Sequence, residues 1–464
     1  MIFLNDEKPI IAVATPTTSN SAIGKIRICG FSDLSDLKSY FLQDVTQIIP
    51  RKASILEIGS EGKILDEAVC TFFKAPNSYN GENILELDVH GNQLNLRRIL
   101  DFFVEKEKIR MAYPGEFTYR ALVNKKMTLS QVEGLDLLIN AQSSLAFDEG
   151  MATLRGELSE KYRELFDLFL RLKSSLELSI DFLEDMGEEN AQKEFNNSLF
   201  EFSNLVNHLF ERTRSDVNSL LTPTVVLLGQ TNAGKSSLFN QLLLNNRSIV
   251  SSMAGTTRDY VSEPLFIENT NFKLVDTAGI RETIDQIERF GIEKALDQIK
   301  NAFFKILVVN PFDKLDLNLL KDIPVDLVVF THADQEGFST DGIEITGNPK
   351  MISANLGPIG PDKGGPIGPG MEGGPIGPKI KKEIIEKFKD LAKSNPILIE
   401  RHRHVIGEIY EKTKGFQEVA KVETDAAILS HELNLLGIKV SDLIGIVSPE
   451  DVLTRIFSNF CIGK

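Results

Sequence analysis

Residues 224–237 read Thr-Val-Val-Leu-Leu-Gly-Gln-Thr-Asn-Ala-Gly-Lys-Ser-Ser. The run 225–228 is short and wholly apolar, as is typical of a strand buried in a parallel sheet. The residues after it, Gly229 to Ser236, fit the pattern GxxxxGK[ST] and lead into a helical stretch. In that context the backbone amides turn toward phosphates, Lys235 brings charge to the β- and γ-phosphates, and Ser236 offers a hydroxyl to Mg²⁺. The stretch predicts a P-loop nucleotide-binding domain of the α/β class.

A second phosphate-facing segment follows the apolar strand predicted at 272–275, and it reads Asp276-Thr277-Ala278-Gly279. An aspartate at this position reaches the magnesium ion, and the glycine lets the backbone sense the γ-phosphate. Together with the P-loop, the segment predicts nucleotide hydrolysis. Ras-like proteins carry a water-orienting glutamine next, but here the residue is Ile280, so hydrolysis needs another group. The acidic residues that follow are candidates: Glu282, Asp285 and Glu288.

Base selectivity is predicted from Asp334, which closes Thr331-His332-Ala333-Asp334, and from Ser353-Ala354 further on. A carboxylate there accepts two hydrogen bonds from guanine that adenine cannot supply, so GTP is favoured over ATP. The expected motif is Asn-Lys-x-Asp, whereas here Thr331 replaces the amide and His332 replaces the lysine stem. We expect the two replacements to loosen nucleotide binding without abolishing the preference for guanine. His332 is interpreted as stacking on the base or facing solvent rather than as a titrating switch.

Hydrophobic periodicity divides the chain into three predicted domains. Residues 1–118 alternate short β-rich runs with turn signals, which predicts an α+β domain. Residues 119–216 and 380–464 show apolar residues at helical spacing, which predicts one helical domain split by an insertion. The inserted domain, 217–379, alternates apolar strands with helical stretches, as a doubly wound parallel sheet does.

Residues 357–378 contain Gly-Pro-Ile-Gly-Pro three times. So much Gly and Pro predicts a mobile insertion rather than a helix or a strand. Collagen is excluded because the glycines do not keep a period of three.

Composition excludes several classes of protein. The chain has 464 residues, about three domains by length, and 42% of them are apolar, as in ordinary globular proteins. Its net charge of −15 opposes unaided binding to a phosphate backbone, so contact with nucleic acid needs a local basic patch or the charge of a partner.

Targeting signals and metal motifs are also missing. The chain lacks a signal-peptide pattern and a run long enough to cross a membrane. Its cysteines, Cys29, Cys70 and Cys461, are too scattered for a disulfide framework. We therefore expect a cytoplasmic protein with no membrane contact. The run 401–404, Arg-His-Arg-His, is no metal site because positions i and i+2 of a helix lie about 200° apart. We expect it to be a solvated or partner-facing patch.

Further motifs are shared with one family. Gly255-Thr256-Thr257-Arg258-Asp259 and Glu288-Arg289-Phe290-Gly291-Ile292 flank the Asp276 segment. Ser78-Tyr79-Asn80-Gly81-Glu82, His90-Gly91-Asn92 and Pro114-Gly115-Glu116-Phe117-Thr118-Tyr119-Arg120-Ala121 precede the P-loop, and the chain ends in Phe460-Cys461-Ile462-Gly463-Lys464. Through these residues the chain resembles, nearly end to end, the MnmE (TrmE) family of tRNA wobble-uridine modification GTPases.

The resemblance implies three parts. The amino-terminal α+β domain is expected to dimerise the protein and to bind a tetrahydrofolate derivative, 5,10-methylene or 5-formyl, through Arg27, Glu82, Arg120 and Lys126. A discontinuous helical domain surrounds an inserted Ras-like P-loop GTPase domain. Expected contacts to GTP are Gly229, Asn232, Ala233, Gly234, Lys235, Ser236, Ser237, Thr256, Thr257, Asp276, Thr277, Ala278, Gly279, Asp334, Ser353 and Ala354.

The resemblance also implies how hydrolysis works without a glutamine. Two GTPase domains meet across a potassium ion, which takes the place of an arginine finger. The expected potassium ligands are Asn232, Ser251, Met253 and Thr256, and the expected magnesium ligands are Ser236 and Thr257. Glu288 is expected to position the attacking water through a bridging water. From the sequence alone, Asn232 is equally well interpreted as an ordinary P-loop residue.

The implied reaction needs a partner. An FAD-dependent protein of the MnmG (GidA) type, in a heterotetramer or larger complex, is expected to join in adding a carboxymethylaminomethyl or aminomethyl group at carbon 5 of the wobble uridine of tRNA. Cys461 is the expected catalytic residue for that step, although a lone cysteine is more commonly a small buried hydrophobe. The alternative is a GTP-gated scaffold with impaired hydrolysis that assembles the modification complex. A P-loop ATPase ranks third, because Asp334 and Ser353-Ala354 count against it.

Overall fold

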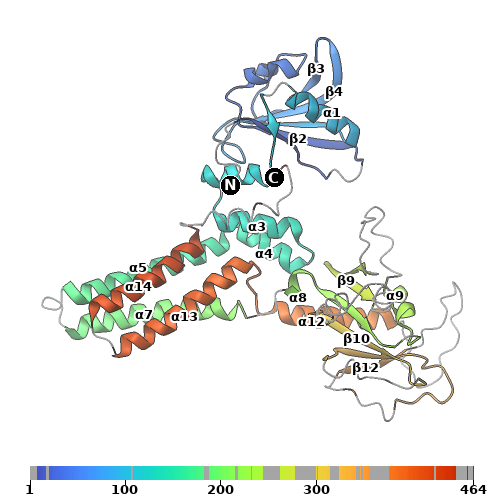
Figure 1. Ribbon diagram of the computed structural model, residues 1–464, viewed down its shortest axis with the longest axis vertical. Helices are drawn as coiled ribbons and strands as arrows, with labels where there is room; N and C mark the ends of the chain where they lie inside the picture. Colours follow the sequence, from blue (N-terminus) through green and yellow to red (C-terminus); the bar gives the residue numbers. More distant parts are fainter. Residues whose placement is uncertain are drawn as a thin grey trace, which may run out of the picture. The chain divides into compact units, whose positions relative to one another are not determined.

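The computed structural model describes residues 8–16, 20–105, 108–181, 188–214, 218–230, 232–243, 262–276, 299, 301–313, 323–340, 345, 349–354, 376–422, 425–445, 457 and 463. The chain forms two compact units (Figure 1). Unit 1 comprises Met1–Asp136, Met151–Leu205 and Glu408–Lys464, and unit 2 comprises Leu137–Gly150 and Val206–Gly407.

Unit 1 begins with a six-stranded sheet in the order β3-β4-β5-β2-β1-β6. Its strands are β1 (Ile10–Val13), β2 (Ile23–Cys29), β3 (Ser54–Ser60), β4 (Lys63–Phe73), β5 (Ile84–His90) and β6 (Arg110–Met111). Neighbours are antiparallel except β1 and β6. One face packs its apolar side chains against α1 (Gln93–Val104) and the short helix η2 (Leu34–Tyr40). On the other face, Phe117 from α2 (Glu116–Val123) packs among residues of β1, β2 and β5.

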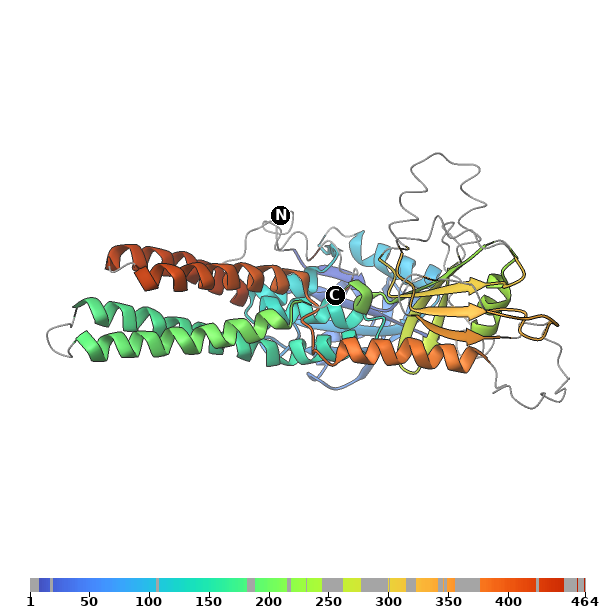
Figure 2. The same cartoon turned by 90° about the horizontal axis from the view of Figure 1, so that it is seen from below.

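Long amphipathic helices form the rest of unit 1, as the periodicity predicts. They are α3 (Leu129–Asn140), α4 (Ser144–Arg155), α5 (Glu157–Asp181), α7 (Glu188–Glu211), α13 (Glu400–Val422) and α14 (Ala426–Ile444), some of which extend into unit 2. In Figure 2, α5, α7, α13 and α14 lie side by side. Phe169 of α5 contacts Phe202 of α7, with 6.2 Å between ring centroids. Gly437 of α14 lies against the Phe169 ring, so close that a Cβ atom there would stand 2.5 Å from it.

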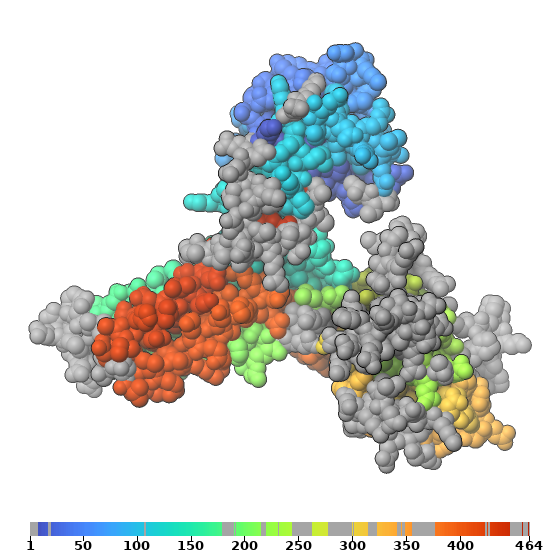
Figure 3. Space-filling view, in the orientation of Figure 1, coloured from blue at the N-terminus to red at the C-terminus, as the bar shows by residue number. Residues whose placement is uncertain are grey.

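The pairing of early with late helices confirms that helical segments flank the α/β region on both sides in sequence. The side chains of α13 and α14 form one continuous surface in the space-filling view (Figure 3). Within the ranges that the structure describes, no helix is long and apolar enough for a membrane crossing.

Unit 2 is built on a second six-stranded sheet, in the order β12-β11-β10-β7-β9-β8. The strands are β7 (Thr224–Leu228), β8 (Ser262–Ile267), β9 (Thr270–Asp276), β10 (Phe304–Val309), β11 (Leu327–Phe330) and β12 (Lys350–Ser353), and its helices are α8 (Asn218–Leu221), α9 (Lys235–Leu243) and α12 (Ile376–Ala392). Only the edge strand β8 is antiparallel to its neighbour among the described pairs. The predicted α/β organisation with a mostly parallel sheet is confirmed, and α8, α9 and α12 pack on one of its faces.

Helix α12 corrects two expectations from the sequence. It begins at Ile376, inside the third Gly-Pro-Ile-Gly-Pro, and the first turn tolerates Pro378 because its amide would have no intrahelical partner. Phe388 of α12 packs edge-on against Phe272 of β9, with 5.6 Å between centroids. The helix therefore belongs to the core of the α/β domain, and the boundary expected at 379/380 lies inside it. Residues 357–375 of the predicted insertion lie outside the described residues.

Candidate functional site

The P-loop lies between β7 and α9, at the carboxyl end of the parallel strands. Gly229 has φ +143, and a Cβ atom there would stand 2.3 Å from the carbonyl oxygen of Val308, so only glycine fits. Gly234 has φ +94, and Asn232 adopts the left-handed region with φ +65, which is uncommon for a residue other than glycine. These angles give the turned backbone that cradles phosphates.

Lys235 and Ser236 occupy the positions that their motif predicts. The buried Lys235 ammonium donates to the carbonyl oxygens of Gly229 at 3.1 Å and Gln230 at 2.6 Å. Ser236 donates its hydroxyl to Oδ2 of Asp276 at 3.3 Å. Because β7 and β9 are parallel neighbours, with Leu227 opposite Asp276, their ends meet at one edge of the sheet. A hydroxyl and a carboxylate oxygen at this edge suit Mg²⁺, which prefers oxygen ligands.

The base-reading segment, Thr331 to Asp334, is hydrogen-bonded to the residue that follows the neighbouring strand β12. The Ala333 N–H donates to the carbonyl of Ala354 at 3.2 Å, and the Ala354 N–H donates to that of Phe330 at 2.7 Å. Asp334 is exposed beside them. The structure thus brings together Asp334 and Ser353-Ala354. His332 has φ +58 and its Nδ1 lies 3.1 Å from Nε2 of Gln335.

Several expected site residues lie outside the described residues: Ser251, Met253, Thr256, Thr257, Thr277, Ala278, Gly279, Glu288 and Cys461. Ser237, which is described, follows Ser236 in the first turn of α9. No group of three or more His, Cys, Asp or Glu side chains suited to a metal occurs among the described side chains.

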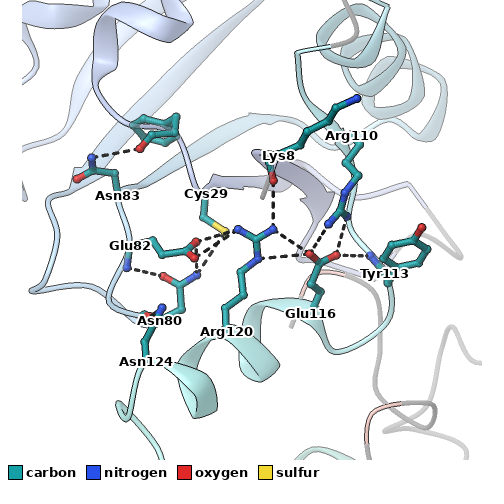
Figure 4. A network of polar contacts seen from close by, with 11 residues as sticks. Lys8, Cys29, Asn80, Glu82, Asn83, Arg110, Tyr113, Glu116, Arg120 and Asn124 are labelled. Atoms are coloured by element: carbon teal, nitrogen blue, oxygen red, sulfur yellow. Dashed lines mark hydrogen bonds and ion pairs between the residues drawn. The ribbon is translucent and has the colours of Figure 1, made fainter. Parts of the chain in front are cut away.

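A second candidate site lies in the amino-terminal part of unit 1, around Glu116 (Figure 4). Glu116 is 1% exposed and accepts two hydrogen bonds from Arg110, at 2.7 and 2.8 Å, and two from Arg120, at 2.9 and 3.3 Å. Arg120 also pairs with Glu82 at 3.2 Å. Burial by itself raises the pKa of Glu116, but the donors from Arg110, the Tyr113 N–H and Arg120 outweigh it and hold the pKa below 4.5. The four residues Glu82, Arg110, Glu116 and Arg120 form what we call the Arg120 cluster.

Cys29 and Asn80 lie against this cluster. The buried Asn80 amide donates to Glu82 at 3.1 Å and to the Cys29 sulfur at 3.3 Å. Burial raises the pKa of Cys29 well above its ordinary value, so this thiol stays protonated and is no nucleophile. Burial likewise raises the pKa of Cys70 to about 12.

Arg27 is held on the same side of the sheet. Its guanidinium donates to Glu86 at 2.7 Å and lies over the rings of Tyr79 and Phe117, 5.5 and 5.7 Å from their centroids. Lys126 is exposed, with its stem beside Gly81, next to Glu82. All four residues expected to bind folate therefore lie in or beside the loop 78–82 and helix α2.

The end of the chain reaches this region. The carbonyl of Gly463 lies 3.5 Å from Nη1 of Arg27. Gly463 is buried, has φ +98, and a Cβ atom there would stand 2.3 Å from the carbonyl oxygen of Val13 in β1. Only glycine fits so close to that strand. The sequence pattern gave no sign of this contact, because its partners are 436 residues apart.

Other functional contacts were missed from the sequence. The pairing of Arg27 with Glu86 follows from the register of β2 and β5, which sets the two residues opposite each other. The alternation of charged residues along both strands could have indicated this pairing from the sequence. The interpretation of the run 401–404 as a solvated patch was wrong for His402, which is fully buried. Arg403 donates to the carbonyl of Thr213 at 2.9 Å, whereas His404 is exposed.

Comparisons with known proteins match both the amino-terminal part and the P-loop part of the chain. The family described as "GTP-binding protein TrmE N-terminus" matches residues 9–126, and that described as "50S ribosome-binding GTPase" matches residues 224–331. The tRNA modification GTPase MnmE of Aquifex aeolicus is 34% identical over 469 residues, covering 98% of this chain and 100% of the relative. The chain belongs to the MnmE family of tRNA modification GTPases.

Other members give the same result. MnmE of Caldicellulosiruptor saccharolyticus is 33% identical, covering 98% of this chain and 99% of its own length, and MnmE of Francisella tularensis subsp. novicida is 32% identical with the same coverage. As a member of the MnmE family, the chain has a GTPase domain and takes part in tRNA modification. The predicted multidomain α/β architecture is confirmed, with the TrmE amino-terminal domain preceding an inserted GTPase domain.

Proposed function

We propose that this chain is a potassium-dependent GTPase that, with an FAD-containing partner, adds a carboxymethylaminomethyl or aminomethyl group at carbon 5 of the wobble uridine of tRNA. The observation that carries the proposal is the contact of Ser236 with Asp276 beside the turned P-loop. A hydroxyl and a carboxylate meet there next to Lys235, as phosphoryl transfer from a nucleotide requires.

Each of the chain's GTP-site residues has a separate proposed role. Ser236 and Thr257 would hold Mg²⁺, which when bound neutralises charge between the β- and γ-phosphates. Lys235 would exchange its contacts with Gly229 and Gln230 for phosphate oxygens. Asp334 would accept the guanine donors. Thr277, Ala278 and Gly279 would sense the γ-phosphate, and Glu288 would position water.

Potassium is proposed because Ile280 stands where a water-orienting glutamine would. Asn232 lies in the loop with a left-handed backbone conformation. Its side chain has an amide oxygen, which is a suitable ligand for K⁺. Ser251, Met253 and Thr256 would complete the ligand set. When bound, the ion supplies positive charge where an arginine finger would supply it.

The amino-terminal site is proposed to hold the tetrahydrofolate derivative. Arg27 and the exposed Lys126 offer cationic donors, and Tyr79 offers an aromatic face, all suited to an acidic ligand with flat rings. Arg120 and Glu82 are paired with each other and shape this site. Cys461, which precedes the buried Gly463 by two residues in the sequence, is proposed to act in the modification step.

The assembly is also proposed. A homodimer would meet through the amino-terminal domains and would join an MnmG (GidA) type partner that carries FAD, in a heterotetramer or larger complex. With a net charge of −15, much of the tRNA backbone is expected to be bound by that partner. The compartment proposed is the cytoplasm, where the tRNA substrate is found.

The experiment uses cells that lack the native enzyme and measures the modified wobble uridine in their tRNA. The native chain should restore modification. Cys461→Ser should abolish it while GTP turnover stays normal, and Glu288→Ala should lose both turnover and modification. If Glu288→Ala hydrolyses no GTP yet restores full modification, the chain is a GTP-gated scaffold. If Cys461→Ser restores full modification, the catalytic role of the thiol is wrong.

A further inference from the structure

Thr331 directly follows β11 and is 1% exposed. Its hydroxyl lies 3.0 Å from the carbonyl oxygen of Ala233 and 3.2 Å from that of Val309. A hydroxyl has a single proton to donate, and the Val309 oxygen already accepts the backbone N–H of Thr331 at 2.8 Å. The contact of the hydroxyl with Ala233 is therefore the shorter of the two. It is also the one whose carbonyl oxygen accepts no backbone hydrogen bond from Thr331.

Ala233 belongs to the P-loop, two residues before Lys235, and it is buried. Its own N–H donates to the carbonyl of Gln230 at 3.3 Å. The bond from Thr331 holds the next peptide, between Ala233 and Gly234. A trans peptide is planar, with its C=O and N–H pointing in opposite directions. A carbonyl that faces Thr331 thus directs the Gly234 N–H to the opposite side of the loop.

That N–H is one of the loop amides that bind phosphates in a P-loop. Gly234 adjoins Lys235, whose ammonium serves the β- and γ-phosphates, so its N–H is suited to the β-phosphate. Thr331 is also the first residue of the base-reading segment, which ends at Asp334. Within that segment, the Ala333 N–H donates a hydrogen bond to the carbonyl of Ala354. One side chain links the base-reading segment to a phosphate-facing peptide.

We propose that Thr331 is a positioning residue of the GTPase, whose hydroxyl orients the peptide between Ala233 and Gly234 and so couples guanine recognition to binding of the β-phosphate. The inference rests on the GTP site proposed above and deepens it. The inference assigns a role to Thr331, which stands where the expected Asn-Lys-x-Asp motif has an asparagine amide. The ligands concerned are guanosine di- and triphosphates.

The test compares GTP, GDP and GMP binding to the full chain by calorimetry, in the native protein, Thr331→Val and Thr331→Ser. Valine keeps the shape but removes the donor, which leaves a buried carbonyl unpaired. We expect Thr331→Val to weaken GTP and GDP by about tenfold and GMP by less than about twofold. Thr331→Ser keeps the hydroxyl and should restore GDP binding to within about twofold of the native chain.

The matched control is Thr413→Val, which removes another buried hydroxyl that donates to a backbone carbonyl, that of Ile409 at 2.7 Å, within α13. It should change no nucleotide affinity. Thermal unfolding without nucleotide checks that each variant folds, and Thr331→Ala replaces the valine variant if that one does not.

Two results would overturn the inference. Native affinity for GDP in Thr331→Val would show that the hydroxyl serves Val309 alone. An equal loss for GDP and GMP would show that it holds only the base-reading segment. Failure of the native chain itself to bind GDP would instead overturn the GTP site, so the two failures are distinguishable.

Discussion

The Ser236 hydroxyl donates to Oδ2 of Asp276 at 3.3 Å, across the ends of two parallel strands. The two residues are separated by 40 positions in sequence and are brought together only by the pairing of β7 with β9. The pair defines the edge of the sheet at which a nucleotide and its metal ion are expected to bind.

The Asp276→Asn substitution tests this pair. The amide keeps an acceptor for Ser236 but removes the negative charge, so the Mg²⁺ concentration for half-maximal GTP turnover should rise by about tenfold or more. The measurement is turnover against Mg²⁺ concentration. Asp313→Asn is the matched control, because Asp313 is also a carboxylate just after a strand, is exposed, and bonds to Asn310 at 2.8 Å. An unchanged Mg²⁺ requirement in Asp276→Asn would count against the assigned site.

The Arg120 cluster makes a prediction about stability. Glu116→Gln leaves the half-buried Arg110 and Arg120 without their shared negative charge, so it should destabilise unit 1 by about 3 kcal/mol at neutral pH. Hydrogen exchange of α2 amides measures this loss. Glu164→Gln is the control, because Glu164 pairs with Lys161 at 2.8 Å on the exposed surface, and its loss should cost under about 1 kcal/mol. Equal effects of the two variants would contradict the importance of the cluster.

The same cluster predicts a pH dependence. The pKa of Glu116 in the folded chain lies below its ordinary value of 4.5. The stability that it contributes is fully present above pH 4.5 and is lost as the pH falls through the lower, folded value. The advantage of the native chain over Glu116→Gln should therefore shrink with acidification below 4.5. An advantage that grows in acid would show that the sign is wrong.

The end of the chain predicts a separation of activities. Gly463→Ala places a methyl group 2.3 Å from the Val13 carbonyl oxygen, at φ +98, so residue 463 must leave its position beside β1. The displacement should lower wobble-uridine modification by about tenfold, with GTP turnover unchanged. Gly62→Ala is the control, because Gly62 has φ +78 but no neighbour within 4 Å. Full modification by Gly463→Ala would show that the contact of Gly463 with β1 is dispensable.

The sequence was most informative where one pattern fixes a local structure. The apolar run of β7, the P-loop and Asp276 predict their own positions, because a parallel sheet brings strand ends to one edge. The contact of Thr331 with Ala233 could not be predicted in this way, since it depends on how β11 and the P-loop pack. The pairing of Arg120 with Glu82 and the docking of Gly463 on β1 likewise join distant segments, and no local periodicity encodes them.

The boundary of the GTPase domain shows a different limit. Gly377 and Pro378 are poor helix formers, so the sequence predicted that no helix begins before residue 379. Tertiary packing overrides this preference, because Ile376 and Ile380 are buried in the core of the sheet. A helix start inside a Gly-Pro repeat is stabilised by burial rather than by propensity.

The most direct test of the account is GTP turnover by the purified chain in K⁺ and then in Na⁺ at equal ionic strength, with and without the FAD-containing partner. Asn232→Ala is measured alongside. The account predicts that turnover falls markedly when Na⁺ replaces K⁺, and that Asn232→Ala is slow in both salts. Equal rates in the two salts, or a native rate in Asn232→Ala, would contradict it.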